Sequence, residues 1–266
     1  MAATISLELY TLRDFLTDQT GFANTMKRVR EIGYEAVEFA GVGAVEGENP
    51  DTTAREARQI LDDNGLTCPS AHRLWRALRD DTEAQIEFLQ TLGCPYVAVP
   101  IIIDEFDRYA YEGYQAFVAD LPPVIEKLKA AGITLGHHNH SIEFLRGPGG
   151  DTIYDLLIEE GGPDLAMTVD VYWAAIAGVN PVNLIDRLHG RMPVIHMKDL
   201  EVAMKEGEMM PGPVFAPVGE GNLDWDAIIP AAKATGAEIW VVEQDLCRRD
   251  HFDCIRSSLE FLKARL

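Results

Sequence analysis

Hydrophobic and polar positions along this chain repeat in one order: an amphipathic helix, a glycine, and a short apolar run rich in β-branched residues. The repeat occurs in the segments REIGYEAVEF, LDDNGLTCPSAH, QTLGCPYVAVP, KAAGITLGHHNH and KATGAEIWVVEQD. Glycine ends a helix in the left-handed conformation without a Cβ penalty, and the apolar run after it is typical of a buried strand. Copies spread over the whole chain favour one repeating βα architecture over two unrelated domains.

Extending this pattern predicts eight strands that alternate with eight helices. The strands are expected near residues 5–10, 36–41, 67–73, 96–101, 133–140, 165–172, 193–199 and 238–245. The helices are expected near residues 21–33, 51–64, 81–92, 111–131, 152–160, 180–189, 224–235 and 251–265. Such alternation predicts the α/β class and a single (β/α)₈ TIM barrel domain over residues 1–266. No GxGxxG or GxxxxGK[ST] follows a strand, which argues against dinucleotide and P-loop folds.

A long stretch at about residues 200–223 interrupts the regular pattern after the seventh predicted strand. It contains several glycines and prolines and shows no helical or strand period. In a barrel, a loop in this place overhangs the catalytic face. We therefore expect a lid-like loop.

Composition narrows the classes of partner. The net charge of −20 repels phosphodiester backbones and anionic membranes, so we expect no nucleic acid and no membrane as partners. No apolar run approaches the roughly 20 residues of a membrane span, and the first residues lack a secretory pattern. The four cysteines show no framework spacing, which favours a cytoplasmic location. A homo-oligomer remains compatible with the sequence.

Ionisable side chains gather at the ends of four successive predicted strands. These ends read HHNH (137–140), VDVY (169–172), IHMKD (195–199) and VEQD (242–245). Because active sites of such barrels lie at the carboxyl ends of the strands, these groups should meet at one rim. Alternate residues of a strand share a face, so the pairs that should face the mouth are His138 with His140, Asp170 with Tyr172, His196 with Lys198, and Glu243 with Asp245. A mixed His, Asp and Glu set suits one divalent ion, and the imidazoles favour a transition metal.

Earlier strands and nearby aromatic residues add further candidates. Glu38 lies inside the apolar run AVEFAG and needs a cation, a substrate hydroxyl or a barrel neighbour, so a structural ion pair and a catalytic role both stay open. His72 ends the third predicted strand and is a candidate for binding a substrate hydroxyl or for holding a loop. Tyr172 and Trp173 could stack on a sugar ring, although aromatic residues at barrel rims also serve packing.

These strand ends resemble the xylose isomerase-like barrel superfamily, in particular its sugar phosphate isomerases and epimerases. The resemblance rests on the segments LGHHNHSIEF, TVDVYW, VIHMKD, PVGEGNLDW and VVEQD in this order. It implies metal binding by residues on strands five to eight, which here correspond to His138, Asp170, His196 and Glu243. Many relatives have glutamate on strand five, so His138 departs from the pattern, and Glu143 in the following loop is the alternative ligand.

The resemblance implies a divalent-metal-dependent isomerase or epimerase acting on a small sugar or keto-sugar through an enediolate. Mn²⁺ is the first expectation for the metal, with Co²⁺, Zn²⁺, Fe²⁺ and Mg²⁺ as alternatives. Epimerases of this superfamily are thought to use glutamates on strands five and eight as an acid/base pair, and here a histidine stands at the first of these positions. His140, Lys198 or Glu38 must then carry the proton.

Three other hypotheses stay open. The HHNH segment also resembles inosose dehydratases and enzymes that eliminate across 3-keto-glycosides, so a lyase is the close alternative. An endonuclease IV-like nuclease fits the fold but not the charge. A sugar-binding barrel without catalysis is the third possibility.

Overall fold

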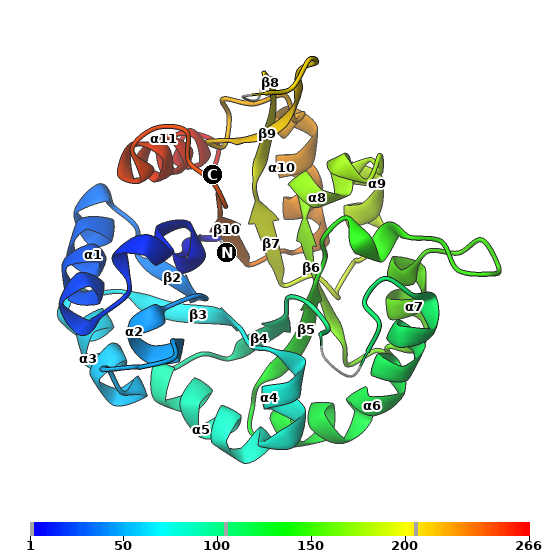
Figure 1. Ribbon diagram of the computed structural model, residues 1–266, viewed down its shortest axis with the longest axis horizontal. Helices are drawn as coiled ribbons and strands as arrows, with labels where there is room; N and C mark the ends of the chain where they lie inside the picture. Colours follow the sequence, from blue (N-terminus) through cyan, green and yellow to red (C-terminus); the bar gives the residue numbers. More distant parts are fainter. Residues whose placement is uncertain (1–2, 104–105, 205–206) are drawn as a thin grey trace.

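A computed structural model describes residues 3–103, 106–204 and 207–266. Eight parallel strands close into a barrel in the order β1-β10-β7-β6-β5-β4-β3-β2, with helices around it (Figure 1). The strands are β1 (Thr4–Glu8), β2 (Ala36–Phe39), β3 (Thr67–His72), β4 (Tyr96–Val99), β5 (Thr134–His138), β6 (Ala166–Asp170), β7 (Val194–Met197) and β10 (Ile239–Val242). The predicted TIM barrel is confirmed, and each strand is shorter than expected by one to three residues at its carboxyl end.

The outer helices also follow the predicted order. They are α1 (Gln19–Ile32), α3 (Ala54–Asp63), α5 (Thr82–Leu92), α6 (Tyr111–Ala130), α7 (Ile153–Glu160), α9 (Pro181–Asp186), α10 (Trp225–Thr235) and α11 (His251–Lys263). Gly33 after α1 and Gly236 after α10 have φ of 113° and 86°, the left-handed cap expected from the repeat. No helix in these described ranges is long and apolar enough to cross a bilayer.

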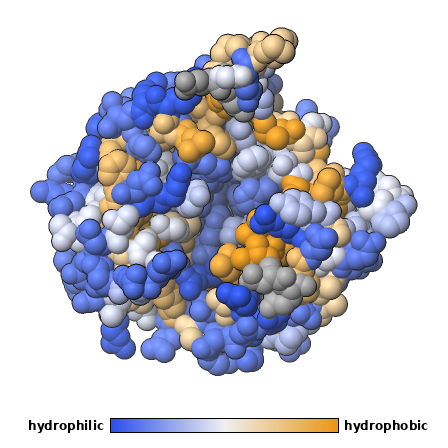
Figure 2. Space-filling model, viewed as in Figure 1, coloured by the Kyte–Doolittle hydropathy of each residue, from blue (hydrophilic) through white to orange (hydrophobic). Residues whose placement is uncertain are grey.

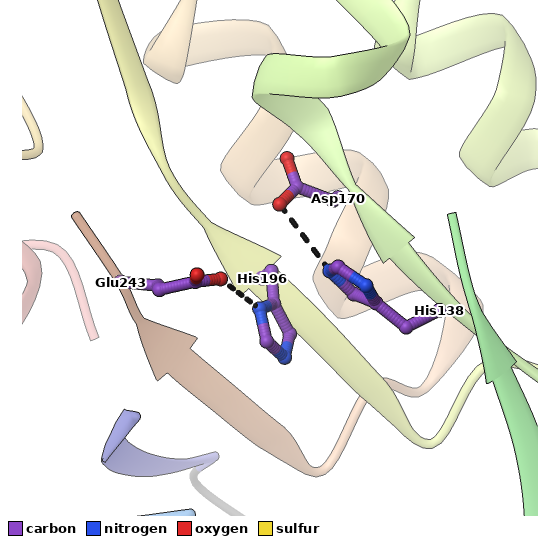
Figure 3. A group of neighbouring side chains, drawn as sticks. All are labelled: His138, Asp170, His196 and Glu243. Atoms are coloured by element: carbon purple, nitrogen blue, oxygen red, sulfur yellow. Dashed lines mark hydrogen bonds and ion pairs between the residues drawn. The ribbon is translucent and has the colours of Figure 1, made fainter. Parts of the chain in front are cut away.

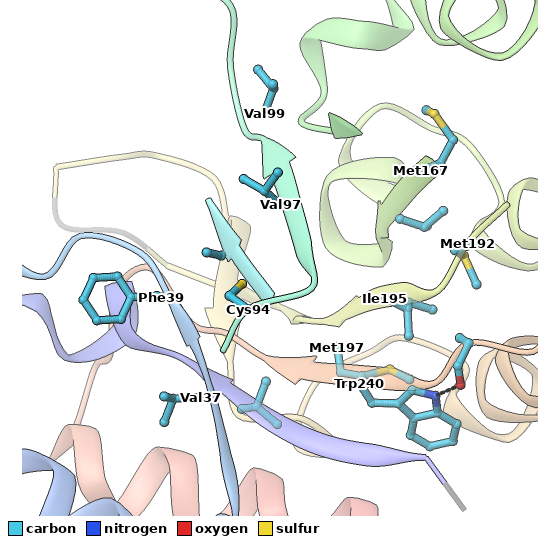
Figure 4. Packing of buried hydrophobic residues seen from close by; sticks show 14 of the residues in the cluster. Val37, Phe39, Cys94, Val97, Val99, Met167, Met192, Ile195, Met197 and Trp240 are labelled. Atoms are coloured by element: carbon cyan, nitrogen blue, oxygen red, sulfur yellow. Dashed lines mark hydrogen bonds between the residues drawn. The ribbon is translucent and has the colours of Figure 1, made fainter. Parts of the chain in front are cut away.

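Apolar packing forms two layers. The larger lies between the barrel and the helices, where side chains such as Phe39, Ile195 and Trp240 are fully buried (Figure 4). A smaller cluster of Tyr96, Ala98, Ala166, Val194 and Val241 fills the barrel itself.

Above that inner cluster the inward positions become ionisable. Because alternate residues face inward, Val194 is followed at the next inward position by His196, and Val241 by Glu243. On β6 the inward positions run from Ala166 through Thr168 to Asp170. The barrel therefore has an apolar plug below and a charged layer at its carboxyl end.

Short elements in the loops change some predictions. Strand β1 stops at Glu8, and a 3₁₀ helix, η1 (Leu9–Phe15), follows it. Strand β6 stops at Asp170, where helix α8 (Val171–Ile176) begins, so the prediction that Asp170 and Tyr172 share a strand face is wrong. The side chain of Asp170 caps α8 by accepting a hydrogen bond from the Trp173 amide, which explains the early end of the strand. Helices α2 (Gly43–Glu46) and α4 (Trp75–Asp80) and the 3₁₀ helix η2 (Ile142–Phe144) lie in other loops.

The stretch predicted as an irregular loop at 200–223 is partly regular. Strands β8 (Asp199–Ala203) and β9 (Gly212–Ala216) form an antiparallel hairpin that projects beyond the barrel (Figure 1). Residues 205–206 of the predicted loop lie outside the described residues. A role as a lid stays a prediction.

Candidate metal centre and active site

The carboxyl ends of four adjacent barrel strands bring His138, Asp170, His196 and Glu243 together (Figure 3). One donor atom of each residue lies within 4.8 Å of the donor atoms of the others, and all four side chains are buried. His196 Nδ1 lies 2.8 Å from Glu243 Oε2, and His138 Nε2 lies 3.4 Å from Asp170 Oδ2. The four residues that the sequence predicts as metal ligands thus form one cluster.

Asp170 and its neighbours are held in place from the backbone. Asn139 Oδ1 accepts a hydrogen bond from the Asp170 amide at 3.0 Å, and Asn139 Nδ2 donates to the Asp170 carbonyl at 3.3 Å. These bonds tie the ends of β5 and β6 together. With Oδ1 of Asp170 used by the α8 cap, Oδ2 is left to face His138 and Lys198.

Lys198 places a buried ammonium among the carboxylates. Its Nζ lies 3.1 Å from Asp170 Oδ2, 2.8 Å from Glu243 Oε2 and 3.0 Å from Asp245 Oδ1. Burial alone would lower the pKa of Lys198, but these carboxylates raise it well above its usual value. The side chain therefore remains a hydrogen-bond donor. Burial and the neighbouring Glu243 charge raise the pKa of Asp245 to about 7.

A second group of charged residues lies beside this cluster on β1, β2 and β3. The rings of His72 and His196 are stacked, with centroids 5.3 Å apart and an interplanar angle of 6°. Glu8 faces the Nδ1 atoms of both rings at 3.3 Å. Glu38 Oε1 faces their Nε2 atoms, at 3.4 Å for His72 and 2.7 Å for His196. Each carboxylate thus bridges both histidines.

Glu38 meets barrel neighbours, one of the possibilities left open by the sequence. Burial opposes its charge, but His196 and His72 lower its pKa to about 2. Burial raises the pKa of Glu8, its strand neighbour. Sequence reasoning missed Glu8, although the signal was the same: a carboxylate inside the apolar strand SLEL.

The donor set fits a divalent cation. Four carboxylates, those of Glu8, Glu38, Asp170 and Glu243, are buried in this layer, and the ammonium of Lys198 faces two of them, Asp170 and Glu243. Several buried polar atoms here also lack a well-oriented hydrogen bond, and they include Glu8 Oε2, both Glu38 oxygens, His72 Nε2, His138 Nδ1 and His196 Nε2. Buried polar atoms without a well-oriented hydrogen bond are costly, and two imidazoles with two carboxylates suit a transition metal.

The alternative ligand Glu143 lies away from the cluster. Its Oε1 accepts a hydrogen bond from the Tyr114 hydroxyl at 2.7 Å and faces His137 Nε2 at 3.3 Å. Its Oε2 accepts from the His140 amide at 2.7 Å. In this arrangement Glu143 fixes the loop that carries His140.

The three residues predicted to contact substrate, His72, Tyr172 and Trp173, lie in different surroundings. His72 lines a cavity of about 700 Å³ at the barrel mouth, together with His138, His140 and Glu243. Tyr172 is buried under the hairpin, stacked on Phe215 of β9 with centroids 4.4 Å apart. Trp173 packs beside His140, with centroids 5.3 Å apart. Contacts of Tyr172 and Trp173 with a substrate stay predictions.

Comparisons with known proteins agree with this fold. Residues 26–265 match the family model described as xylose isomerase-like TIM barrel. The chain is 24% identical to the rhizopine catabolism protein MocC of Rhizobium meliloti, over 86% of this chain and 77% of that protein. It is 20% identical to an inosose dehydratase of Lacticaseibacillus casei, over 70% of this chain and 72% of that protein.

Solved structures of low sequence identity share the fold. A sugar phosphate isomerase/epimerase from Parabacteroides distasonis superposes with a TM-score of 0.77 at 21% identity, covering 98% of both chains. The IOLI protein, solved with a bound zinc atom, superposes with a TM-score of 0.71 at 13% identity, covering 98% of this chain and 97% of the other. These likenesses confirm the barrel that the resemblance implied.

Proposed function

Because the chain belongs to the xylose isomerase-like TIM barrel family, we propose that it is a divalent-metal-dependent enzyme that removes a proton next to the carbonyl of a small keto-sugar. The observation that carries the proposal is the buried cluster of His138, Asp170, His196 and Glu243. A divalent ion held there would supply Lewis acidity that makes the neighbouring C–H more acidic. Mn²⁺ is our first choice, and zinc is present in the IOLI protein structure.

His140 is the proton carrier that the geometry favours. It lines the cavity beside the ligand His138, with ring centroids 4.9 Å apart, and its amide is fixed by Glu143. The ammonium of Lys198 can donate a hydrogen bond to oxygen atoms on which charge develops. Glu38 is buried beneath His72 and His196, so we assign it to positioning these rings rather than to contact with substrate.

After proton removal we favour elimination, in which a substituent on the carbon next to the deprotonated carbon is expelled. Two observations support it over epimerisation. Glu143, which follows β5, contacts Tyr114 and His137 and so does not pair with Glu243 as an acid/base couple, while His72 and His140 both line the cavity. One of the relatives in sequence is a dehydratase. Isomerisation or epimerisation is the second candidate, since it needs the same first step.

Proton removal is testable without knowing the outcome. Mn²⁺-loaded protein in D₂O should exchange the C–H next to the carbonyl of methyl 3-keto-glucoside, measured by NMR, and EDTA dialysis should abolish the exchange. Elimination would also release methanol. Unchanged exchange by exhaustively metal-free protein would contradict the metal dependence.

Single substitutions separate ligands from proton carriers. Asp170→Ala, His196→Ala and Glu243→Ala should lower the bound metal and the exchange together. His140→Ala should keep the metal and lose roughly 10²- to 10⁴-fold in rate, the usual effect of a positioned acid or base. His189, exposed on the surface, provides the matched control, because His189→Ala should change neither. Loss of the metal in His140→Ala but not in His138→Ala would exchange the two roles.

A further inference from the structure

The cavity at the barrel mouth has two unlike sides. Its polar side carries Glu8, His72, His138 and Glu243, the charged layer already described. The other side is apolar. It is formed by Val45 of α2, Leu74 and Ala77 at α4, Phe88 of α5, and Pro100 and Ile101 after β4. We call these six residues the apolar wall. A hollow with hydrophilic residues at its centre and hydrophobic residues along part of its border is visible in Figure 2.

The apolar wall is not closed by the protein itself. Leu74 is 42% exposed, and the other five side chains are only partly buried although they line a cavity. A volume of about 700 Å³ lies in the range that holds drug-sized ligands, which are larger than one sugar ring. An apolar group of the ligand placed against this wall would remove its surface from water.

The described lining of the cavity offers a phosphate no unpaired cation on that side. Among the described lining residues the only permanent cation is Arg73, and its guanidinium is already used. It forms a salt bridge with Glu46, donates to Gln85 Oε1 at 2.7 Å and stacks over the Phe88 ring at 4.6 Å. Because Arg73 and Glu46 neutralise each other, the lining carboxylates that remain are those of Glu8, Glu243 and Asp245, and none of them attracts a dianion.

We propose that the apolar wall is a subsite for an uncharged apolar substituent, so that the substrate is an unphosphorylated keto-sugar carrying an alkyl or aryl group through oxygen. This inference rests on the proposed function for the position of the keto-sugar. In the favoured elimination the C–H and the C–O bond to the substituent break, a C=C bond forms, and the proton passes to the leaving oxygen. The substituent departs as an alcohol, with no oxidant or reductant consumed.

The test compares benzyl and methyl 3-keto-glucosides, whose leaving alcohols are alike in chemistry but differ in apolar area. We expect kcat/KM to be roughly 10- to 100-fold higher for the benzyl compound, the usual range for one apolar group in a hydrophobic pocket. Benzyl glucoside, which lacks the ketone, should likewise inhibit more strongly than methyl glucoside. If kcat/KM is equal for the two keto-glucosides and inhibition is equal for the two glucosides, the subsite is overturned. If no proton exchange occurs but benzyl glucoside still inhibits more strongly than methyl glucoside, only the proposed reaction is overturned.

A rim substitution tests the location of the subsite. Leu74→Asp should reduce the benzyl-to-methyl ratio toward one. Leu145, 44% exposed and outside the cavity lining, gives the matched control, since Leu145→Asp should keep the wild-type ratio. An unchanged ratio in Leu74→Asp would overturn the assignment. Tighter inhibition by glucose 6-phosphate than by glucose would overturn the exclusion of phosphate.

Discussion

The carboxylate of Asp199 organises the loop that joins the hairpin to α10, and removing its charge should destabilise the protein. Asp199 is fully buried at the start of β8. Its two oxygens accept five hydrogen bonds, from the amides of Leu200, Gly219, Gly221 and Leu223 and from Trp225 Nε1. Three of the five end on Oδ2, at 2.7 to 3.0 Å.

The substitution Asp199→Asn keeps the shape but replaces one acceptor oxygen by an NH₂ donor. If the amide oxygen takes the place of Oδ2, the Leu200 and Leu223 amides lose their acceptor and face a donor. Each donor left unsatisfied in this setting costs about 1–3 kcal/mol, so the free energy of unfolding should fall by about 3 kcal/mol. For a chain of this size each kcal/mol lowers Tm by about 2–4 °C, so Tm should fall by about 6–12 °C.

Urea unfolding followed by circular dichroism at pH 7 measures the change. Asp224→Asn is the matched control, because the exposed Asp224 makes one cap bond to the Ala227 amide and asparagine caps helices equally well. The control should stay within about 0.5 kcal/mol of wild type. A loss under about 1 kcal/mol for Asp199→Asn would refute the reasoning, because it would show that the two part-buried amides of Leu200 and Leu223 find other acceptors at little cost.

Three further predictions concern pH, packing and partners. Burial would raise the pKa of Asp155, but hydrogen bonds from Thr152 and the charge of Arg187 outweigh it and lower this pKa. The carboxylate therefore stabilises the folded protein above the unfolded pKa of about 3.9, and this stabilisation is lost as pH falls through the folded pKa. The destabilisation caused by Asp155→Asn should therefore be larger at pH 7 than at pH 2, and equal destabilisation at both pH values would contradict this. Gly136 leaves room for the Tyr96 hydroxyl inside the barrel, so Gly136→Ala should cost about 1–3 kcal/mol in urea unfolding, and a neutral result would show that the ring can move. Duplex DNA should not bind at micromolar concentration in physiological salt, measured by fluorescence anisotropy, because the net charge is −20.

The sequence predicted those parts of the molecule that depend on the local repeat of hydrophobic and polar residues. Helix–glycine–strand repeats identified the eight strands, and the positions of ionisable residues at strand ends predicted that they meet at one rim. The family resemblance then singled out His138, Asp170, His196 and Glu243, which the structure brings together. The period failed where a strand ends early. At β6 the cap of α8 by Asp170 turns the chain away after Asp170, so Tyr172 leaves the strand face.

Contacts between distant segments could not be read from the sequence. Asp199 meets amides some 20 residues away, and nothing in the local pattern marks it as more than a polar strand end. The hairpin of β8 and β9 was hidden because glycines and prolines recur from Gly207 to Gly221, within β9 as well as on both sides of it, and obscure the strand period. Glu143 could not be separated from His138 as a ligand, because its contacts with Tyr114 and His137 depend on packing against α6.

The charged layer also explains why the roles of its members must be measured together. Its carboxylates, imidazoles and ammonium stand on an apolar plug, and a group in such surroundings depends strongly on its neighbours. The single side chain of His196 contacts three carboxylates, those of Glu8, Glu38 and Glu243. Lys198 contacts two of the four proposed ligands, Asp170 and Glu243. Removing one charge therefore alters the proton affinity of several others. A loss of turnover by itself identifies no role here, whereas metal content measured beside turnover distinguishes a lost ligand from a lost proton carrier.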